Sequence, residues 1–331
     1  MDPYEDKFAD LLGYDQNTME QIPWEFSLRQ EIVMTPQFSE ALRRIARMHK
    51  KCKATGQSDS LFISAQSGVG KTTLLEYYSA QFPRFDEDNR TVIPVVHVVT
   101  PANPTELSFT TEILAAIGES SERRAADNVN KICHFLSECG CELLMIDEIQ
   151  HFVDRKKIAE GRKVSDSVKI LMQEIKKPVV IAGLPRAVEF VKSNMQLARR
   201  SSSRHKMLPF SFEEQDEQKQ FRGFLKGLQE KLPIQSIELR DARVAQRFFY
   251  ASAGIIDYVI KILEGAVQLA AEQKIQLLDL ALFAEAYKEK VWADAPESLN
   301  PFLENAYLRF LNQPDEPFAG WDYSMDRGKQ K

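Results

Sequence analysis

The stretch FISAQSGVGKTTLLEYY, residues 62–78, decides the fold, because it holds most of a phosphate-binding loop. The consensus of that loop, G-x-x-x-x-G-K-[ST], follows a strand and opens a helix. The apolar run before the loop predicts a short buried strand, and KTTLLEYY predicts the helix. Ala65 stands where the first glycine of the consensus is expected. Alanine fits there if its φ stays negative, so the substitution weakens the pattern more than the chemistry.

The residues of this turn are the types that a nucleotide phosphate needs. Gly68 and Gly70 let backbone N–H groups turn inward, and the helix N-terminus adds its positive end. Lys71 is predicted to reach the β and γ phosphates, and the Thr72 hydroxyl to ligate Mg²⁺. A chance glycine turn is the alternative. The predicted nucleotide-binding residues are Gln66, Ser67, Gly68, Val69, Gly70, Lys71, Thr72 and Thr73.

A second motif argues against a chance glycine turn. The stretch LLMIDEIQHF, residues 143–152, is an apolar run that ends in Asp147 and Glu148. Asp147 is predicted to hold Mg²⁺ through water, together with Thr72. Glu148 is predicted to polarise the water that attacks the γ-phosphate, as general base. An acidic strand end is common by itself, but after GVGKTT it indicates an ATPase that uses ATP and Mg²⁺.

The remaining pattern predicts an α/β domain followed by a helical one. Apolar strands alternate with helices up to about residue 209, which indicates a parallel sheet covered on both faces. From residue 210 every periodic segment is helical, which predicts a small all-helical lid. The expected domains are an N-terminal arm at 1–37, the nucleotide-binding domain at 38–209, the lid at 210–295 and a C-terminal docking tail at 296–331. The arm is expected to pack on the chain's own body or on a neighbour.

Composition limits the class of protein. A chain of 331 residues with 44% hydrophobic and 27% charged residues is typical of a globular protein. No apolar run approaches the roughly 20 residues of a membrane span, and the acidic N-terminus does not resemble a secretory signal, so we expect a cytoplasmic protein with no membrane partner. The net charge of −5 argues against coating nucleic acid with the whole surface, but not against a local basic stripe.

The cysteines allow two interpretations. The cluster CHFLSECGC suggests a zinc site, but its spacing matches no common zinc motif, so buried thiols beside a strand are favoured. The zinc ligands would be Cys133, His134, Cys139 and Cys141.

The acidic pair, the α/β core and the helical lid together resemble the AAA+ ATPases. That resemblance implies ATP bound between subunits and an arginine finger supplied by a neighbour. The segment MQLARRSSSRHKMLPF, residues 195–210, is where the finger is expected; a solvated basic loop is the alternative. The strand end VVIAGLP lacks a polar sensor residue, and Asp257 stands where a sensor arginine is often found, so we expect slow or partner-stimulated hydrolysis. The candidate fingers are Arg199, Arg200 and Arg204.

The blocks TPQF, LLMIDEIQHF, VVIAGLP and SAGIIDYVIKI resemble those of the TniB/TnsC transposition ATPases, over about residues 35–273. These regulators belong to bacterial transposons, including CRISPR-associated ones. The resemblance implies an ATP-dependent ring or helical filament on double-stranded DNA. It also implies two protein partners, a TniQ-type target selector and the transposase.

Two basic clusters are candidate DNA contacts. The first, with Arg123, Arg124 and Lys131, is predicted on one short helix, and the second follows the acidic motif as Arg155, Lys156 and Lys157. Such clusters would neutralise phosphates without reading bases. Acidic residues are interleaved with them, so ordinary solvated charge is an equal alternative. Other functions are a helicase-loader or initiator-like ATPase, or a nucleotide-gated scaffold that does not bind DNA.

Aromatic residues and prolines alternate in the tail. Aromatic anchors in a loose segment are typical of a peptide that docks on a partner, here the transposase by resemblance. The alternative is that they fold back on the lid. The aromatics are Phe302, Tyr307, Phe310, Phe318, Trp321 and Tyr323.

Overall fold

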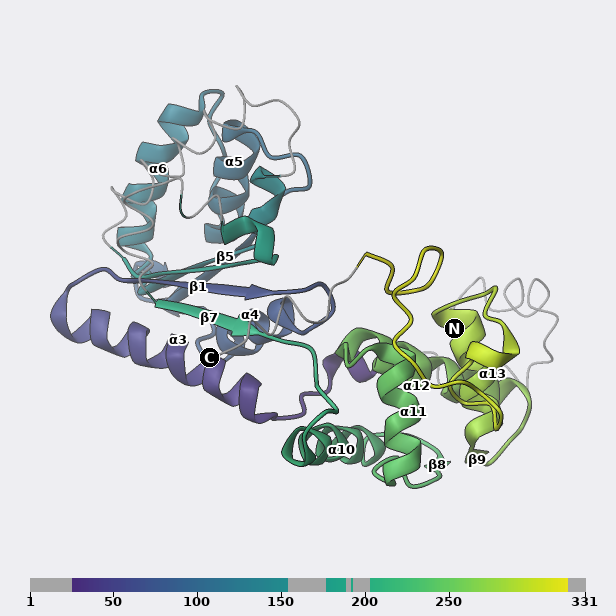
Figure 1. Cartoon of the computed structure of the whole chain (residues 1–331). Helices are drawn as coiled ribbons and strands as arrows, with labels where there is room; N and C mark the ends of the chain where they lie inside the picture. Colours follow the sequence, from purple (N-terminus) through teal and green to yellow (C-terminus); the bar gives the residue numbers. More distant parts are fainter. Residues whose placement is uncertain (1–25, 154–176, 189–191, 193–202, 321–331) are drawn as a thin grey trace, which may run out of the picture. The chain divides into compact units, whose positions relative to one another are not determined.

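The computed structural model describes residues 26–153, 177–188, 192 and 203–320 (Figure 1). The chain divides into two compact units. One is the α/β unit, Pro36–Leu208; the other is the helical unit, which joins the segment before residue 36 to the segment from residue 209 onward. The stretch VSDSVKILMQEIKK, residues 164–177, has a helix-like sequence, and all of it except Lys177 lies outside the described residues.

A parallel sheet forms the centre of the α/β unit. Within the described residues it has five strands in the order β4-β5-β6-β1-β7, and every neighbouring pair is parallel. The three central strands are buried along their whole length, which is why their sequences are continuous apolar runs. The predicted α/β fold is confirmed. The strands are β1 (Ser60–Ala65), β4 (Val95–Val99), β5 (Leu143–Asp147), β6 (Val179–Gly183) and β7 (Ser203–Met207).

Helices cover both faces of this sheet. Figure 1 shows α5 and α6 on one face and α3 and α4 on the other. Helix α5 begins with a capping box between Thr105 and Ser108 and ends at Gly118, whose φ of 91° suits a glycine. The helices are α3 (Pro36–Thr55), α4 (Lys71–Ala80), α5 (Glu106–Ile117) and α6 (Ala125–Glu138); a hairpin pairs β2 (Phe85–Glu87) with β3 (Arg90–Val92), and short 3₁₀ turns are η2 (Ile149–Phe152) and η3 (Pro185–Ala187).

The sequence analysis assigned no strand to residues 195–210, where the structure has strand β7. Among the described residues the strand lies at the edge of the sheet and pairs with β1 alone. The face of the strand that carries Arg204 and Lys206 is exposed, whereas Met207 is buried. A polar strand of this kind carries little apolar signal, and that explains the miss.

The helical unit has its own apolar core, rich in phenylalanine. Rings of Phe248, Phe283 and Phe302 pack edge-on or tilted at centroid distances of 4.9–5.7 Å. The predicted helical part is therefore present. Its elements are η1 (Leu28–Gln30), α10 (Gln215–Gln229), β8 (Gln235–Ser236), α11 (Ala242–Ser252), α12 (Ile256–Glu272), β9 (Leu277–Leu278), α13 (Leu280–Lys290) and η4 (Glu297–Leu299).

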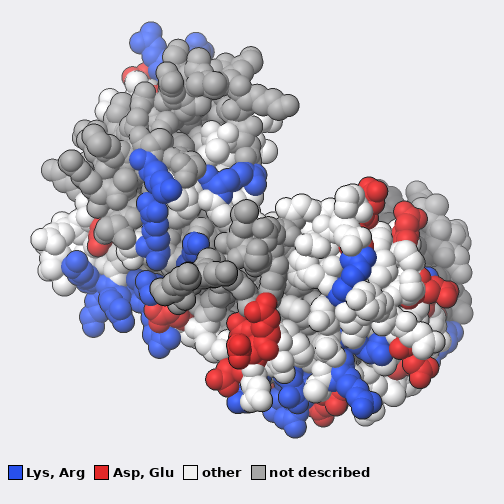
Figure 2. Space-filling view, viewed as in Figure 1, with Lys and Arg blue, Asp and Glu red and all other residues white. Residues whose placement is uncertain are grey.

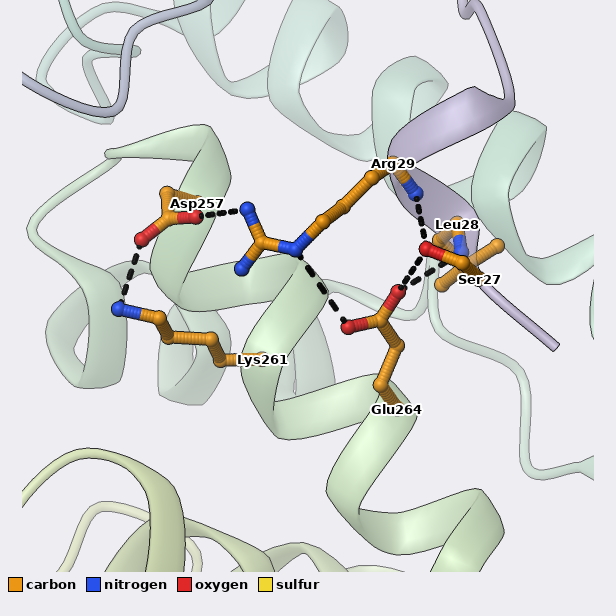
Figure 3. Close-up of polar contacts among 6 residues, drawn as sticks. All are labelled: Ser27, Leu28, Arg29, Asp257, Lys261 and Glu264. Atoms are coloured by element: carbon orange, nitrogen blue, oxygen red, sulfur yellow. Dashed lines mark hydrogen bonds and ion pairs between the residues drawn. The ribbon is translucent and has the colours of Figure 1, made fainter. Parts of the chain in front are cut away.

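The described part of the predicted arm packs on this helical unit. Leu28 is fully buried in its core. Glu264 of α12 accepts hydrogen bonds from the Ser27 hydroxyl (3.0 Å) and the Leu28 N–H (2.8 Å) (Figure 3). Arg29 pairs with Asp257 at 2.7 Å, and Lys261 holds the other oxygen of that carboxylate at 2.8 Å. Of the two expectations for the arm, packing on its own body holds for residues 26–35.

The described part of the tail also packs on the helical unit. Phe302 and Phe318 are 2% and 4% exposed within its core, and Arg247 donates to the carbonyls of Pro301 and Leu303. Folding back is therefore the alternative that holds for these residues, and they differ from a free docking peptide. Tyr307 is 69% exposed. Trp321 and Tyr323 lie outside the described residues.

Two further findings concern metals and membranes. Cys139 and Cys141 are buried at the end of α6, and burial raises the pKa of Cys141 to about 12. Among the described residues no group of three His, Cys, Asp or Glu side chains is placed to hold a metal ion. No helix in the described part of the chain is long and apolar enough to cross a membrane.

Candidate nucleotide-binding site

The predicted phosphate-binding loop is a tight turn between β1 and α4. Gly68 and Gly70 have φ of 76° and 99°, in the region that favours glycine, and Gly70 directly precedes the first residue of α4. Ala65 is the last residue of β1 and keeps an extended strand conformation. An extended position does not require glycine, which explains why the consensus can lose its first glycine here.

Lys71 is buried inside this loop, with a 5% exposed side chain. Its ammonium donates to the carbonyls of Ala65 and Gln66, both at 3.2 Å. Burial lowers the pKa of Lys71, and the carboxylates of Glu148 and Asp147 oppose that shift. The two groups that accept from this buried ammonium are neutral carbonyls, so it is well suited to bind an anion such as a phosphate.

The two predicted magnesium residues are in contact. The Thr72 hydroxyl donates to Asp147 Oδ2 at 2.7 Å, although 75 residues separate them. Asp147 is fully buried, and Thr100 at the end of β4 fixes its backbone through two hydrogen bonds to its carbonyl. A hydroxyl and a carboxylate at one point supply the hard oxygen ligands that Mg²⁺ prefers. The residues present therefore fit the predicted metal.

Glu148 occupies an unusual backbone conformation directly after β5. Its φ and ψ are 56° and 36°, a left-handed conformation that costs a non-glycine residue about 1–3 kcal/mol. The Glu148 N–H donates to Asp147 Oδ1 at 2.7 Å, so the two acidic residues are linked at the turn. Such strain is typical of functional sites, and it aims the Glu148 side chain differently from a continuing strand.

Gln150 is a site residue that sequence reasoning missed. Its amide donates to the Glu148 carboxylate and accepts from the backbone N–H of Leu184 at 3.0 Å. The only signal in the sequence was a polar residue in the otherwise apolar start of the turn after β5. That signal does not reveal a partner 34 positions away.

The candidate fingers and DNA contacts are only partly described. Arg204 is exposed on β7, and Arg199, Arg200, Arg155, Lys156 and Lys157 lie outside the described residues.

The sequence analysis predicted the first basic cluster on one short helix, but the structure places only part of it on α6. Arg123 and Arg124 are exposed and precede α6, because the Asn128 side chain accepts from the Glu122 N–H at 2.6 Å and keeps that segment irregular. Lys131 lies on α6 and donates to the Ser120 carbonyl at 2.7 Å. It also pairs with Glu119 and Glu122, which favours a local role for this lysine over a DNA contact.

The fold and the site together define a protein of the AAA+ class. Solved structures support this architecture: ORC2 of Aeropyrum pernix (ADPNP-ADP complexes) has a TM-score of 0.60 at 15% identity, covering 81% of this chain and 72% of that one. ORC1 of Aeropyrum pernix in complex with DNA gives 0.59 at 15% identity, over 78% and 66% of the two chains. CDC6P of Pyrobaculum aerophilum gives 0.58 at 12% identity, over 81% and 72%. At these identities the similarity concerns the fold alone.

The chain belongs to the TniB family. The family model described as "Bacterial TniB protein" matches residues 24–208, which is more than half of the chain. That range ends with the last residue of the α/β unit. The predicted family is therefore confirmed. No curated protein matches the sequence.

Proposed function

We propose that this chain is a cytoplasmic, ATP-dependent regulator of DNA transposition. In this proposal it oligomerises on double-stranded target DNA and connects a TniQ-type target selector to the transposase. The observation that carries the proposal is a nucleotide-site geometry, in a TniB family chain, that brings together Lys71, Thr72, Asp147 and Glu148.

The proposed nucleotide chemistry assigns one role to each residue. The backbone of residues 66–70 and the Lys71 ammonium bind the phosphates, and Thr72 and Asp147 would hold Mg²⁺. The metal would neutralise charge that develops on the phosphate oxygens. Glu148 accepts the proton of the attacking water as general base. Arg199, Arg200 or Arg204 is proposed to complete a neighbour's site as the arginine finger.

The distribution of charge supports a DNA contact on the α/β unit. The whole chain has 43 Lys and Arg against 48 Asp and Glu, yet Lys and Arg outnumber acidic residues within residues 36–208. On the face drawn in Figure 2, the coloured atoms of the α/β unit are mostly blue, whereas the helical unit shows both colours. A local basic surface binds phosphates without reading sequence, so we propose non-specific DNA binding.

Fluorescence anisotropy with labelled double-stranded DNA tests this proposal. Binding should require ATP and weaken steeply as salt rises, because counterions are released from the DNA. Lys71→Ala should abolish ATP binding and ATP-dependent DNA binding. Glu148→Gln should keep both and slow hydrolysis by about 100-fold or more. Lys226→Ala, in the helical unit, is the matched control for loss of one lysine.

Two outcomes would contradict the proposal in different ways. ATP binding with no DNA binding at low salt indicates the nucleotide-gated scaffold instead. Hydrolysis by Glu148→Gln at the wild-type rate would show that Glu148 is not the general base.

A further inference from the structure

The side-chain amide of Gln150 joins two segments at the edge of the candidate nucleotide site. Its nitrogen donates to Glu148 Oε2, and its oxygen accepts from the Leu184 N–H, directly after β6. Gln150 is 3% exposed. The Leu184 N–H can only donate, so the oxygen of the amide must face it and the NH₂ group must face Glu148. The network therefore fixes the orientation of the amide.

The end of β6 is shaped to admit this amide. A Cβ added at Gly183 would lie 2.9 Å from Gln150 Oε1 and 2.6 Å from the Ile149 side chain. A side chain at position 183 would thus displace Gln150 or the turn that carries it. The sequence shows no polar side chain at the end of this strand, and Gln150 supplies a polar group there from the neighbouring turn.

We propose that Gln150 is a positioning residue that orients the Glu148 carboxylate for proton transfer and ties it to the end of β6. This inference rests on the proposed ATP hydrolysis. The amide occupies Oε2 and leaves Oε1 as the oxygen that accepts the proton of water. Without Gln150 the carboxylate would be free to rotate on a turn that is already strained.

Three variants isolate this role. Gln150→Leu removes both hydrogen bonds and should lower kcat by about 10-fold or more, with little change in the KM for ATP. Gln150→Glu keeps an acceptor for Leu184 but places a second carboxylate beside Glu148. Repulsion between the two carboxylates should displace Glu148 from its position, so Gln150→Glu should lower both kcat and the melting temperature.

The double variant Glu148→Gln/Gln150→Glu exchanges the amide and the carboxylate. The charge is unchanged, and the new carboxylate can accept from both Leu184 N–H and the amide at 148. Its melting temperature should return towards that of wild type, above that of Gln150→Glu, while hydrolysis stays lost. Ile149→Val is the matched control: it alters the same buried turn without touching the amide, so kcat and its pH profile should not change.

The outcomes separate this inference from the proposed function. If wild type hydrolyses ATP and Gln150→Leu keeps its kcat, the positioning role is wrong. If Gln150→Leu does not fold, the kcat of Gln150→Glu decides instead, and a wild-type kcat overturns the inference. If wild type binds no ATP, the proposed function fails, whereas the melting temperature of the exchanged pair still decides whether Gln150 holds Glu148. A double variant no more stable than Gln150→Glu shows that it does not.

Discussion

At the scale of single residues, burial affects the protonation of several histidines in the α/β unit. His97 on β4 shows this most simply, because its Nε2 is buried with no hydrogen-bond partner among the described residues. Burial lowers the pKa of His97, while Asp147 on β5 and Glu76 on α4 oppose that shift. The pKa values of His49 and His205 in the same unit are also lowered, with burial as the largest cause. At these three positions the folded unit therefore favours the neutral imidazole.

A pH dependence of stability follows for His97. The unfolded state takes up the proton near pH 6.5 and the folded state only at lower pH, so the unfolded state binds more protons between the two pKa values. The stability contribution is complete above about pH 6.5 and is lost as pH falls through that window, by at most about 1.4 kcal/mol per pH unit. Between pH 7.5 and 5.5 the melting temperature of His97→Gln should fall less than that of wild type.

The control for this measurement is His134→Gln, since His134 is exposed on α6. This variant should lose stability on acidification to the same extent as wild type. If His97→Gln also follows wild type, the protonation of His97 does not contribute to acid sensitivity.

At the scale of elements, helix α12 connects the core of the helical unit with the N-terminal segment that contains η1. One face of α12 is buried in the core, and Asp257 and Glu264 of α12 bind the segment that contains η1. Glu264 accepts two hydrogen bonds from that segment, and one of the donors is the backbone N–H of a fully buried residue, Leu28. The carboxylate thus satisfies a polar group that the burial of Leu28 would otherwise leave unpaired.

Glu264→Ala should therefore lower the free energy of unfolding of the helical unit by about 1–3 kcal/mol. Chemical denaturation of the full chain measures the change. Glu289→Ala is the matched control: in the part of the chain that the structure describes, Glu289 pairs with the adjacent Lys290 alone, near the surface, so we expect a change below about 1 kcal/mol. Equal effects of the two substitutions would show that η1 is not held through Glu264.

At the scale of the whole molecule, the two ends of the described chain complete the helical unit. Leu28 comes from the N-terminal segment, Phe302 and Phe318 come from the tail, and all three are buried in one core with α10–α13. The unit is therefore closed by residues nearly 300 positions apart in sequence. Its stability depends on segments that contain no long helix.

A truncation and a substitution in the tail test this dependence. Deleting residues 296–331 exposes core positions, and full burial of one phenylalanine is worth roughly 1.5–3 kcal/mol, so the helical unit should lose several kcal/mol and melt at lower temperature. The tail substitution Tyr307→Ala, at a side chain that is 69% exposed, should leave that melting transition in place. Differential scanning calorimetry with and without ATP follows both units. A deletion with an unchanged melting temperature would restore the idea of an independent docking tail.

The sequence by itself determined the parts whose signals are local. The glycine turn before Lys71, the apolar strand before Asp147 and Glu148, and the alternation of strands and helices are contiguous patterns, and each follows from backbone geometry or from burial on both faces. The structure brings Lys71, Thr72, Asp147 and Glu148 together, while their roles stay predictions. The sequence also predicted the TniB family, which the family model confirms.

Only the tertiary structure decided the features that depend on a distant partner. Strand β7 carries exposed polar side chains on one face, so it had no continuous apolar pattern to read. Leu28 and Phe318 are buried in a core formed with α12, which is far from both residues in sequence. Gln150 acquires its position from a backbone N–H at the end of another strand. Such contacts are fixed when the chain folds, because a residue's local sequence does not encode what will lie opposite it.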